Sequence, residues 1–298
     1  MPDSPLVECV PNFSEGRRSD VIQALVKCIG DVPDVRMLDV HSDPDHNRSV
    51  ITFVGSPQAV VEAAYHAVAE AARHINMEQH QGQHPRLGAT DVVPFVPISG
   101  VTLEDCAALA RQLGERVGRD LEIPVYLYEA AASRPERINL ADVRRGEYEG
   151  LKSAIGTDPQ RQPDYGPARL GKAGATAIGA RMPLIAFNVY LTTDDVMIAQ
   201  EIARSVRFSG GGLAYIKALG LLVNGRAQVS MNLTDYTQTP VHRVVELIRL
   251  EAARYGVGVQ SSELVGLIPQ AALIDAARWY LQLDGFAMNQ ILEDRLRS

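Results

Sequence analysis

Short apolar runs along the chain alternate with longer stretches in which apolar residues recur every three to four positions, a pattern typical of alternating strands and helices. The first part predicts strands at residues 6–13, 35–41, 49–55 and 91–98, and helices at 18–30 and 58–75. Two prolines in the strand at 91–98 favour an edge position or a strand end, since proline cannot donate to the ladder. A helix at 102–122, opened by a T-x-x-D capping box, and a strand at 124–129 follow.

The same order then restarts. The second part predicts strands at residues 182–191, 213–223, 227–234 and 257–265, helices at 194–207, 240–255 and 269–283, and a glycine-rich turn at 208–212. The pair Asn224-Gly225 favours a tight hairpin, because both central positions of a type I′ turn need a positive φ.

Residues 130–179 differ from both parts. They are rich in Gly, Pro, Arg, Asp and Gln, and only a short helix near residues 140–151 is indicated. Such a stretch is expected to be a linker, a lid or a binding loop. Each flanking part has the order of a split βαβ, ferredoxin-like fold. We therefore expect an α/β (α+β) protein with two ferredoxin-like βαββαβ sandwich subdomains, residues 1–179 and 180–298, and a ligand cleft or tunnel between them.

Composition narrows the function classes. Hydrophobic residues make up 46% and charged residues 22% of the 298 positions, as in ordered globular proteins. The formal charge of −7 argues against a nucleic-acid partner. No apolar run approaches the ~20 residues that span a bilayer, and the first residues do not resemble a signal peptide. Cys9, Cys28 and Cys106 form no CxxC or zinc pattern, which favours a reduced, cytoplasmic protein.

The densest set of reactive side chains is the segment 79–91, QHQGQHPRLGATD. His80 and His84 suit proton transfer near neutral pH, and Arg86 suits bidentate binding of a carboxylate. The alternative, that both histidines are solvent-facing loop residues, has about equal weight. The segment has neither an HExxH motif nor a carboxylate at ligand spacing, so no metal is expected.

Three further segments are candidates. Residues 40–50, VHSDPDHNRSV, form either a binding loop or a polar hairpin, and they lack the glycine and glutamate of a calcium loop. Residues 10–16, VPNFSEG, lead from a strand into a helix and suit either an anion or a helix cap. Residues 164–181, DYGPARLGKAGATAIGAR, form either a glycine-lined wall of a ligand site or a flexible linker. Nucleophilic catalysis has little support, since the cysteines lie in apolar-periodic segments and no G-x-S-x-G elbow occurs.

Six strings together carry a resemblance that covers residues 6 to 283, in register: VECVPNFSEG, LDVHSDPDHNRSV, GQHPRLGATDVVPFVPI, GATAIGARMPLIAFNVYL, QVSMNLTDY and SSELVGLIP. The chain resembles the glutamate formimidoyltransferases of histidine degradation. The resemblance implies transfer of the formimidoyl group from N-formimidoyl-L-glutamate to tetrahydrofolate as co-substrate, without a metal. It also implies two α/β subdomains with a folate tunnel between them. The cyclodeaminase fused to some family members is not implied here.

The resemblance also implies site residues. The catalytic histidine of the H-P-R motif corresponds to His84, and His41 stands where the mammalian form has an aspartate near the active site. The two carboxylates of the substrate make Arg86, Arg48 and Arg181 candidate clamps, with His41 as a further substrate-binding candidate. The folate-binding stretch is glycine-rich like that of the family but less aromatic and serine-rich than the mammalian one. It comprises Gly166, Pro167, Ala168, Arg169, Leu170, Gly171, Lys172, Ala173 and Gly174.

Other functions stay open at this point. A related enzyme could use a formyl donor, and tandem ferredoxin-like domains also occur as ligand-binding proteins without chemistry. RNA binding is disfavoured by the acidic balance and by the lack of paired exposed aromatic residues. The sequence does not decide the oligomeric state, and a homodimer is one of the alternatives.

Overall fold

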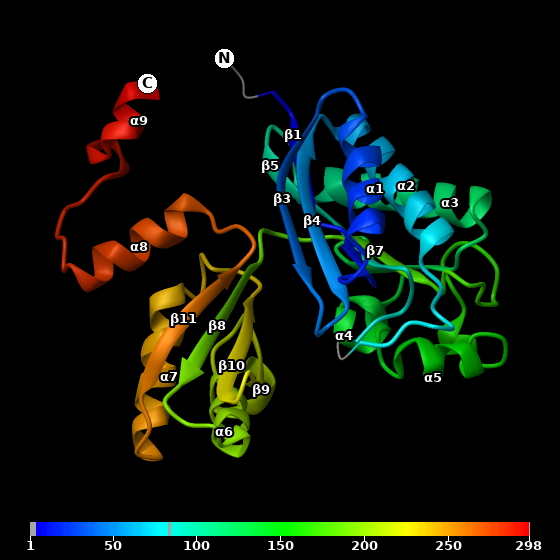
Figure 1. Cartoon of the computed structure of the whole chain (residues 1–298). Helices are drawn as coiled ribbons and strands as arrows, with labels where there is room; N and C mark the ends of the chain where they lie inside the picture. The colour runs from blue at the N-terminus through cyan, green and yellow to red at the C-terminus, as the bar shows by residue number, and fades with distance from the viewer. Residues whose placement is uncertain (1–3, 83–84, 298) are drawn as a thin grey trace. The chain divides into compact units, whose positions relative to one another are not determined.

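The computed structural model describes residues 4–82 and 85–297, and the chain forms two compact units, Met1–Met182 and Pro183–Ser298 (Figure 1). Each unit contains a sheet covered by helices, and the expected mixed α/β fold class is confirmed. Within the described residues, no helix combines the length and the apolar character needed to cross a bilayer.

The first unit is built around one large mixed sheet. Its strands are β1 Leu6–Cys9, β2 Asn12–Phe13, β3 Val35–Asp43, β4 Arg48–Gly55, β5 Thr90–Ser99, β6 Val125–Glu129 and β7 Thr176–Ala180. Its longer helices are α1 Ser19–Gly30, α2 Pro57–His74 and α3 Leu103–Asp120, with the shorter η1 Pro135–Arg137, α4 Leu140–Val143, α5 Glu147–Ala154 and η2 Pro159–Arg161 between β6 and β7. From one edge to the other, the strand order is β3, β4, then β1 and β2 side by side along the chain, then β5, β7 and β6. The four strands β5, β1, β4 and β3 lie next to one another in the order of a ferredoxin-like sheet.

Helices α1, α2 and α3 pack on one face of this sheet through apolar residues of both layers, such as Leu25, Phe53 and Leu113 (Figure 1). The N-terminus of α3 has the expected capping box, in which Thr102 and Asp105 bond each other's backbone N–H. A smaller core, which includes Tyr128 and Leu151, joins α4 and α5 to other strand residues. The first unit therefore carries a second, thinner layer made by the segment between β6 and β7.

Two strand predictions were wrong in detail. Residues 6–13 are not one strand, because the ladder breaks at Val10 and Pro11 between β1 and β2. Strand β5 is also not an edge, since it lies between β1 with β2 and β7. The Pro94 carbonyl accepts from Val10 N at 3.3 Å, so this edge of Pro94 faces the break between β1 and β2. The N–H that proline lacks would point in the same direction. No ladder hydrogen bond is therefore lost, and the proline is tolerated inside the sheet.

The stretch at 130–179 is more ordered than predicted. The helix expected near residues 140–151 is divided into α4 and α5 by Gly146, whose φ is +83°. Strand β7 was missed, and it pairs in parallel with β5 and β6. The expected boundary after residue 179 falls inside β7, whereas the compact units divide after Met182.

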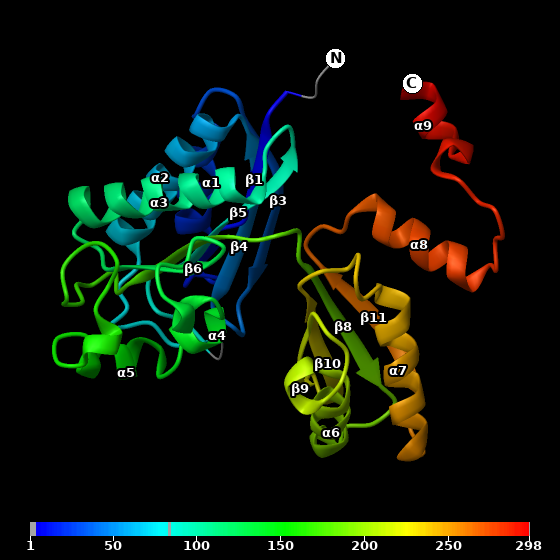
Figure 2. The ribbon, with the colours of Figure 1, turned by 180° about the vertical axis from the view of Figure 1, so that it is seen from behind.

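The second unit repeats the βαββαβ order with an antiparallel sheet β11, β8, β10, β9. Its elements are β8 Ile185–Leu191, α6 Val196–Val206, η3 Phe208–Gly210, β9 Ile216–Val223, β10 Arg226–Leu233, α7 Val241–Arg254, β11 Val259–Val265, α8 Gln270–Tyr280, η4 Met288–Gln290 and α9 Leu292–Arg297. Helices α6 and α7 bury the apolar face of this sheet (Figure 2). The predicted tight turn is confirmed by the φ values of +50° and +73° at Asn224 and Gly225.

A bulge in β5 directs a side chain into the candidate site. Phe13 pairs with Thr90 and Asn12 with Val92, so Asp91 is an extra residue in β5. Thr90 lies beside helix α2, whereas the Asp91 carboxylate reaches Arg144 at the end of α4. A bulge re-aims a side chain in this way, and bulges are frequent next to functional sites.

Candidate functional site

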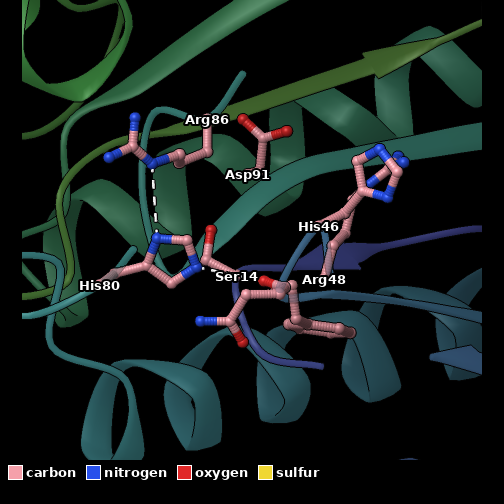
Figure 3. Close-up of a pocket in the computed structure, with 8 residues that line it drawn as sticks. Ser14, His46, Arg48, His80, Arg86 and Asp91 are labelled. Atoms are coloured by element: carbon pink, nitrogen blue, oxygen red, sulfur yellow. Dashed lines mark hydrogen bonds between the residues drawn. The ribbon is translucent and has the colours of Figure 1, made fainter. Parts of the chain in front are cut away.

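A small pocket with a cavity volume of about 10 Å³ lies in the first unit, where three of the four candidate segments meet (Figure 3). Segments 10–16, 40–50 and 79–91 all contribute side chains. The lining residues are Phe13, Ser14, His46, Asn47, Arg48, His80, Arg86 and Asp91. Three segments that are distant in sequence therefore form one polar site.

Asn47 joins the three segments. It precedes β4 with a φ of +48°, a conformation that asparagine tolerates better than most residues. Its Oδ1 accepts from Gly16 N at 3.0 Å, and its Nδ2 donates to the Gln81 carbonyl at 3.0 Å. The Asn47 carbonyl in turn accepts from Nε2 of His80 at 3.1 Å. One buried residue thus fixes the spacing of all three loops.

His80 is held as a neutral imidazole. Because a carbonyl can only accept, the bond to Asn47 requires that Nε2 carry the hydrogen. Nδ1 is then an acceptor, and Nε of Arg86 donates to it at 3.4 Å (Figure 3). Burial lowers the pKa of His80 below its usual value. With both ring nitrogens engaged, His80 is poorly placed to relay a proton.

The guanidinium of Arg86 is already paired. Nη1 lies 2.7 Å from Oε2 of Glu147, and Nη2 lies 2.6 Å from Oε1 of Glu149. Nη1 also donates to Oε2 of Glu149 at 3.1 Å. The Arg86 side chain is only 11% exposed. A substrate carboxylate would therefore have to compete with two glutamates for this arginine.

Arg48 has the opposite surroundings. Its Nε is buried without a hydrogen-bond partner, and across the described residues no ion pair joins its guanidinium. Burial lowers its pKa to about 10, and the nearby charge of Arg144 acts in the same direction, whereas the charges of Asp91 and Asp43 oppose this shift. A buried charge is costly unless it is paired. Arg48 is thus the group in this pocket best prepared to receive an anion.

Asp91 is paired inside the site. It is 2% exposed, its Oδ1 accepts from Leu87 N at 3.0 Å, and its carboxylate forms an ion pair with Arg144. The pair fastens the end of the segment 79–91 to α4. Arg144 was not identified from the sequence, where nothing near it signals a partner 53 positions away.

The other two predicted substrate-binding residues, His41 and Arg181, do not line the pocket. The predicted catalytic residue, His84, is outside the described residues. His41 is exposed in β3 opposite Val50 and does not line the pocket. Arg181 follows β7, where its backbone N donates to the Phe95 carbonyl and its Nη1 donates to the carbonyl of Met182, each at 3.0 Å. Of the four predicted substrate-binding residues, the pocket brings together Arg48 and Arg86.

The glycine-rich stretch runs beside the segment 79–91. Ala89 N donates to the Ala173 carbonyl at 2.8 Å. A Cβ on Gly166 would lie 2.5 Å from the Ile123 carbonyl, and a Cβ on Gly174 would lie 2.5 Å from a backbone oxygen of the neighbouring loop. Nothing lies within 4 Å of the corresponding position at Gly171. Two of these glycines are therefore required by the fold, and the third leaves room for a ligand.

The described part of the chain, residues 4–82 and 85–297, contains no group of three or more His, Cys, Asp or Glu side chains that could hold a metal ion. The acids near the pocket are instead matched to arginines or to a histidine. His46 Nδ1 lies 2.5 Å from Oδ2 of Asp43. Among the described residues, the pocket thus presents hydrogen-bond donors and the guanidinium of Arg48, which has no ion-pair partner there.

Comparison with known proteins identifies the family of the chain. The family description "Formiminotransferase domain, N-terminal subdomain" matches residues 6–181, and "Formiminotransferase domain" matches residues 186–295. A glutamate formimidoyltransferase of Thermoplasma acidophilum is 51% identical over 297 residues, and one of Streptococcus pyogenes is 49% identical over 295, with 98% of both chains covered in each case. The formimidoyltransferase-cyclodeaminase of Mus musculus is 44% identical over 286 residues, which are 93% of this chain and 52% of that protein. The chain therefore belongs to the formiminotransferase family.

Proposed function

We propose that this protein transfers the formimidoyl group from N-formimidoyl-L-glutamate to tetrahydrofolate, giving L-glutamate and 5-formimidoyltetrahydrofolate. Two relatives named glutamate formimidoyltransferase support the reaction, because they match this chain over 98% of its length at about half identity. The location of the substrate site is supported by Arg48, whose buried Nε has no hydrogen-bond partner among residues 4–82 and 85–297. The three unpaired cysteines and the nature of the substrates suit a cytoplasmic enzyme.

The proposed chemistry needs one proton relay. A ring nitrogen of tetrahydrofolate forms a bond to the amidine carbon and loses its proton, while the bond from that carbon to the glutamate nitrogen breaks and this nitrogen gains a proton. A single imidazole can accept the first proton and donate the second. We assign this role to His84, because His80 and Arg86, on either side of it in sequence, both line the pocket.

Arg48 is proposed to bind a carboxylate of formimidoylglutamate. The pocket has a cavity volume of about 10 Å³, roughly the room that one water needs. Only one end of the substrate, such as a carboxylate, is therefore proposed to reach into it. An incoming carboxylate would supply the partner that Arg48 does not have in the described part of the chain. His41 and Arg181 stay predictions as substrate-binding residues.

Tetrahydrofolate is proposed to bind along the glycine-rich stretch. Gly171 is the position at which the backbone has open space, and Lys172 beside it is exposed. Gly166 and Gly174 serve the close packing of the protein's own backbone. Within this stretch we therefore assign the flat ring system of the folate to the turn around Gly171.

The test is an assay of the purified full chain with both substrates. Release of L-glutamate should require tetrahydrofolate and formimidoylglutamate together. Formylglutamate with tetrahydrofolate, and 5-formyltetrahydrofolate with glutamate, serve as the control pairs. Turnover of the formyl compounds at the rate of the formimidoyl donor, or no release of glutamate at all, would contradict the proposed function.

A further inference from the structure

Helix α5 holds Arg86 from two directions. Glu147 and Glu149 take up the two Nη atoms of the guanidinium, at 2.7 and 2.6 Å. Tyr148, which lies between them in sequence, donates its backbone N–H to the Arg86 carbonyl at 2.9 Å. Both the side chain and the main chain of Arg86 are therefore bound by three consecutive residues at the start of one helix.

The same helix also binds the other end of the segment. Lys152 Nζ lies 2.5 and 2.7 Å from the two carboxylate oxygens of Glu78, and the Tyr148 hydroxyl donates to Oε1 of Glu78 at 2.8 Å. Glu78 and Arg86 stand on opposite sides of His84 in sequence. Helix α5 thus binds Glu78, which precedes the position assigned to proton transfer, and Arg86, which follows it.

The hydrogen bonds of Arg86 leave little capacity for a substrate. A guanidinium has five N–H donors. One of them serves His80, two serve Glu149 and one serves Glu147. Arg48, in the same pocket, has no such partners within the described residues.

We propose that Glu147 and Glu149 are positioning residues, which act through Arg86 to fix the described residues that flank His84 in sequence. The proposal rests on the proposed function. Arg86 then has a structural role, because it links α5 to His80. The substrate carboxylate is bound by Arg48 instead. The rival interpretation is that Arg86 binds the substrate and that the two glutamates compete with it.

The two interpretations predict opposite changes in the double variant Glu147→Gln, Glu149→Gln. If the acids position the segment, kcat should fall by about 10- to 100-fold, because small misplacements of reacting groups are costly, while KM for formimidoylglutamate changes by less than about twofold. If the acids compete with the substrate, KM should fall and kcat should be kept. That second result would overturn the proposal.

Two further variants sharpen the experiment. Arg86→Lys keeps the charge but loses the fork, so it should lower kcat in the same way. Combined with the double variant it should add less than the product of the two effects, as expected for residues in contact. Glu104→Gln is the matched control, since it removes an exposed acid paired with Arg111 at 2.8 Å on α3. Equal effects of Glu104→Gln and the double variant would also overturn the proposal.

Hydrogen–deuterium exchange separates this proposal from the proposed function. The amides of residues 78–90 should exchange at least about tenfold faster in the double variant than in the wild type, whichever substrate the protein uses. Unchanged exchange would refute the positioning role even in an active enzyme. If the double variant does not fold, Glu147→Gln alone keeps the two-bond pair of Glu149 with Arg86 and should show a smaller change in the same direction.

Discussion

The imidazole Nε2 of His80 lies 3.1 Å from the main-chain oxygen of Asn47, and this contact assigns the tautomer of a histidine in the candidate site. The hydrogen sits on Nε2, and Nδ1 faces Arg86. Two histidines four positions apart are thereby separated in role. His80 supports the site, and proton transfer stays assigned to His84.

The pKa of His80 should therefore be below the ordinary value of 6.5, because burial disfavours the imidazolium. Between the folded pKa and 6.5 the unfolded chain binds more protons, so His80 makes stability fall as the pH drops through this window. NMR titration of the ring should give this lowered pKa and the Nε2–H tautomer. A pKa at or above 6.5 would contradict the assignment.

Asn47→Ala should destabilise the protein by about 1–3 kcal/mol, because Gly16 N and the Gln81 carbonyl lose their side-chain partner. Asn224→Ala is the matched control. Asn224 has a similar φ of +50°, but its side chain is exposed and makes no hydrogen bond within the described residues. Urea unfolding of both variants separates the hydrogen bonds from the backbone strain. Equal losses in the two variants would show that the bonds of Asn47 contribute little.

Asp91→Ala should lower the free energy of unfolding by about 3–5 kcal/mol, since it leaves Arg144 half-buried without its partner. The loss should be much larger than that of Asp142→Ala, which breaks an exposed ion pair with Arg145. Chemical denaturation of both variants provides the comparison. A loss below about 1 kcal/mol for Asp91→Ala would mean that this pair does not stabilise the site.

Gly171→Ala and Gly174→Ala should behave differently. At Gly174 the φ is +71° and a Cβ would lie 2.5 Å from a backbone oxygen, so the substitution should lower Tm markedly. At Gly171 the space is open, so Tm should change little, while KM for tetrahydrofolate should rise if the ring system lies against this turn. An unchanged KM in Gly171→Ala would remove this turn from the folate site.

Features that depend on neighbouring residues were predicted well from the sequence. The turn at Asn224 and Gly225 and the capping box at Thr102 both follow from residues within three positions of each other. Strand β7 was not predicted, because its sequence TAIGA has few of the residues that favour strands. Its Gly179 is explained only by the structure, where a Cβ would lie 2.4 Å from the Tyr128 carbonyl.

For the candidate site, the contributing segments were predicted from the sequence, but their contacts with one another were not. The segments 10–16, 40–50 and 79–91 were found because polar and glycine residues cluster in each of them. Their convergence was not predictable, since the order of the strands decides it. The arginine Arg144 and the acids Glu147 and Glu149 were missed, because their partners lie more than 50 positions away.

The most direct test is the rate of L-glutamate release from formimidoylglutamate and tetrahydrofolate by the wild type and by His84→Ala. His66→Ala, which changes an exposed histidine on α2, is the control. The wild type and the control should turn over alike, and His84→Ala should be slower by about 10²–10⁴-fold with an unchanged Tm. Turnover of His84→Ala at the wild-type rate would contradict the proposed proton relay.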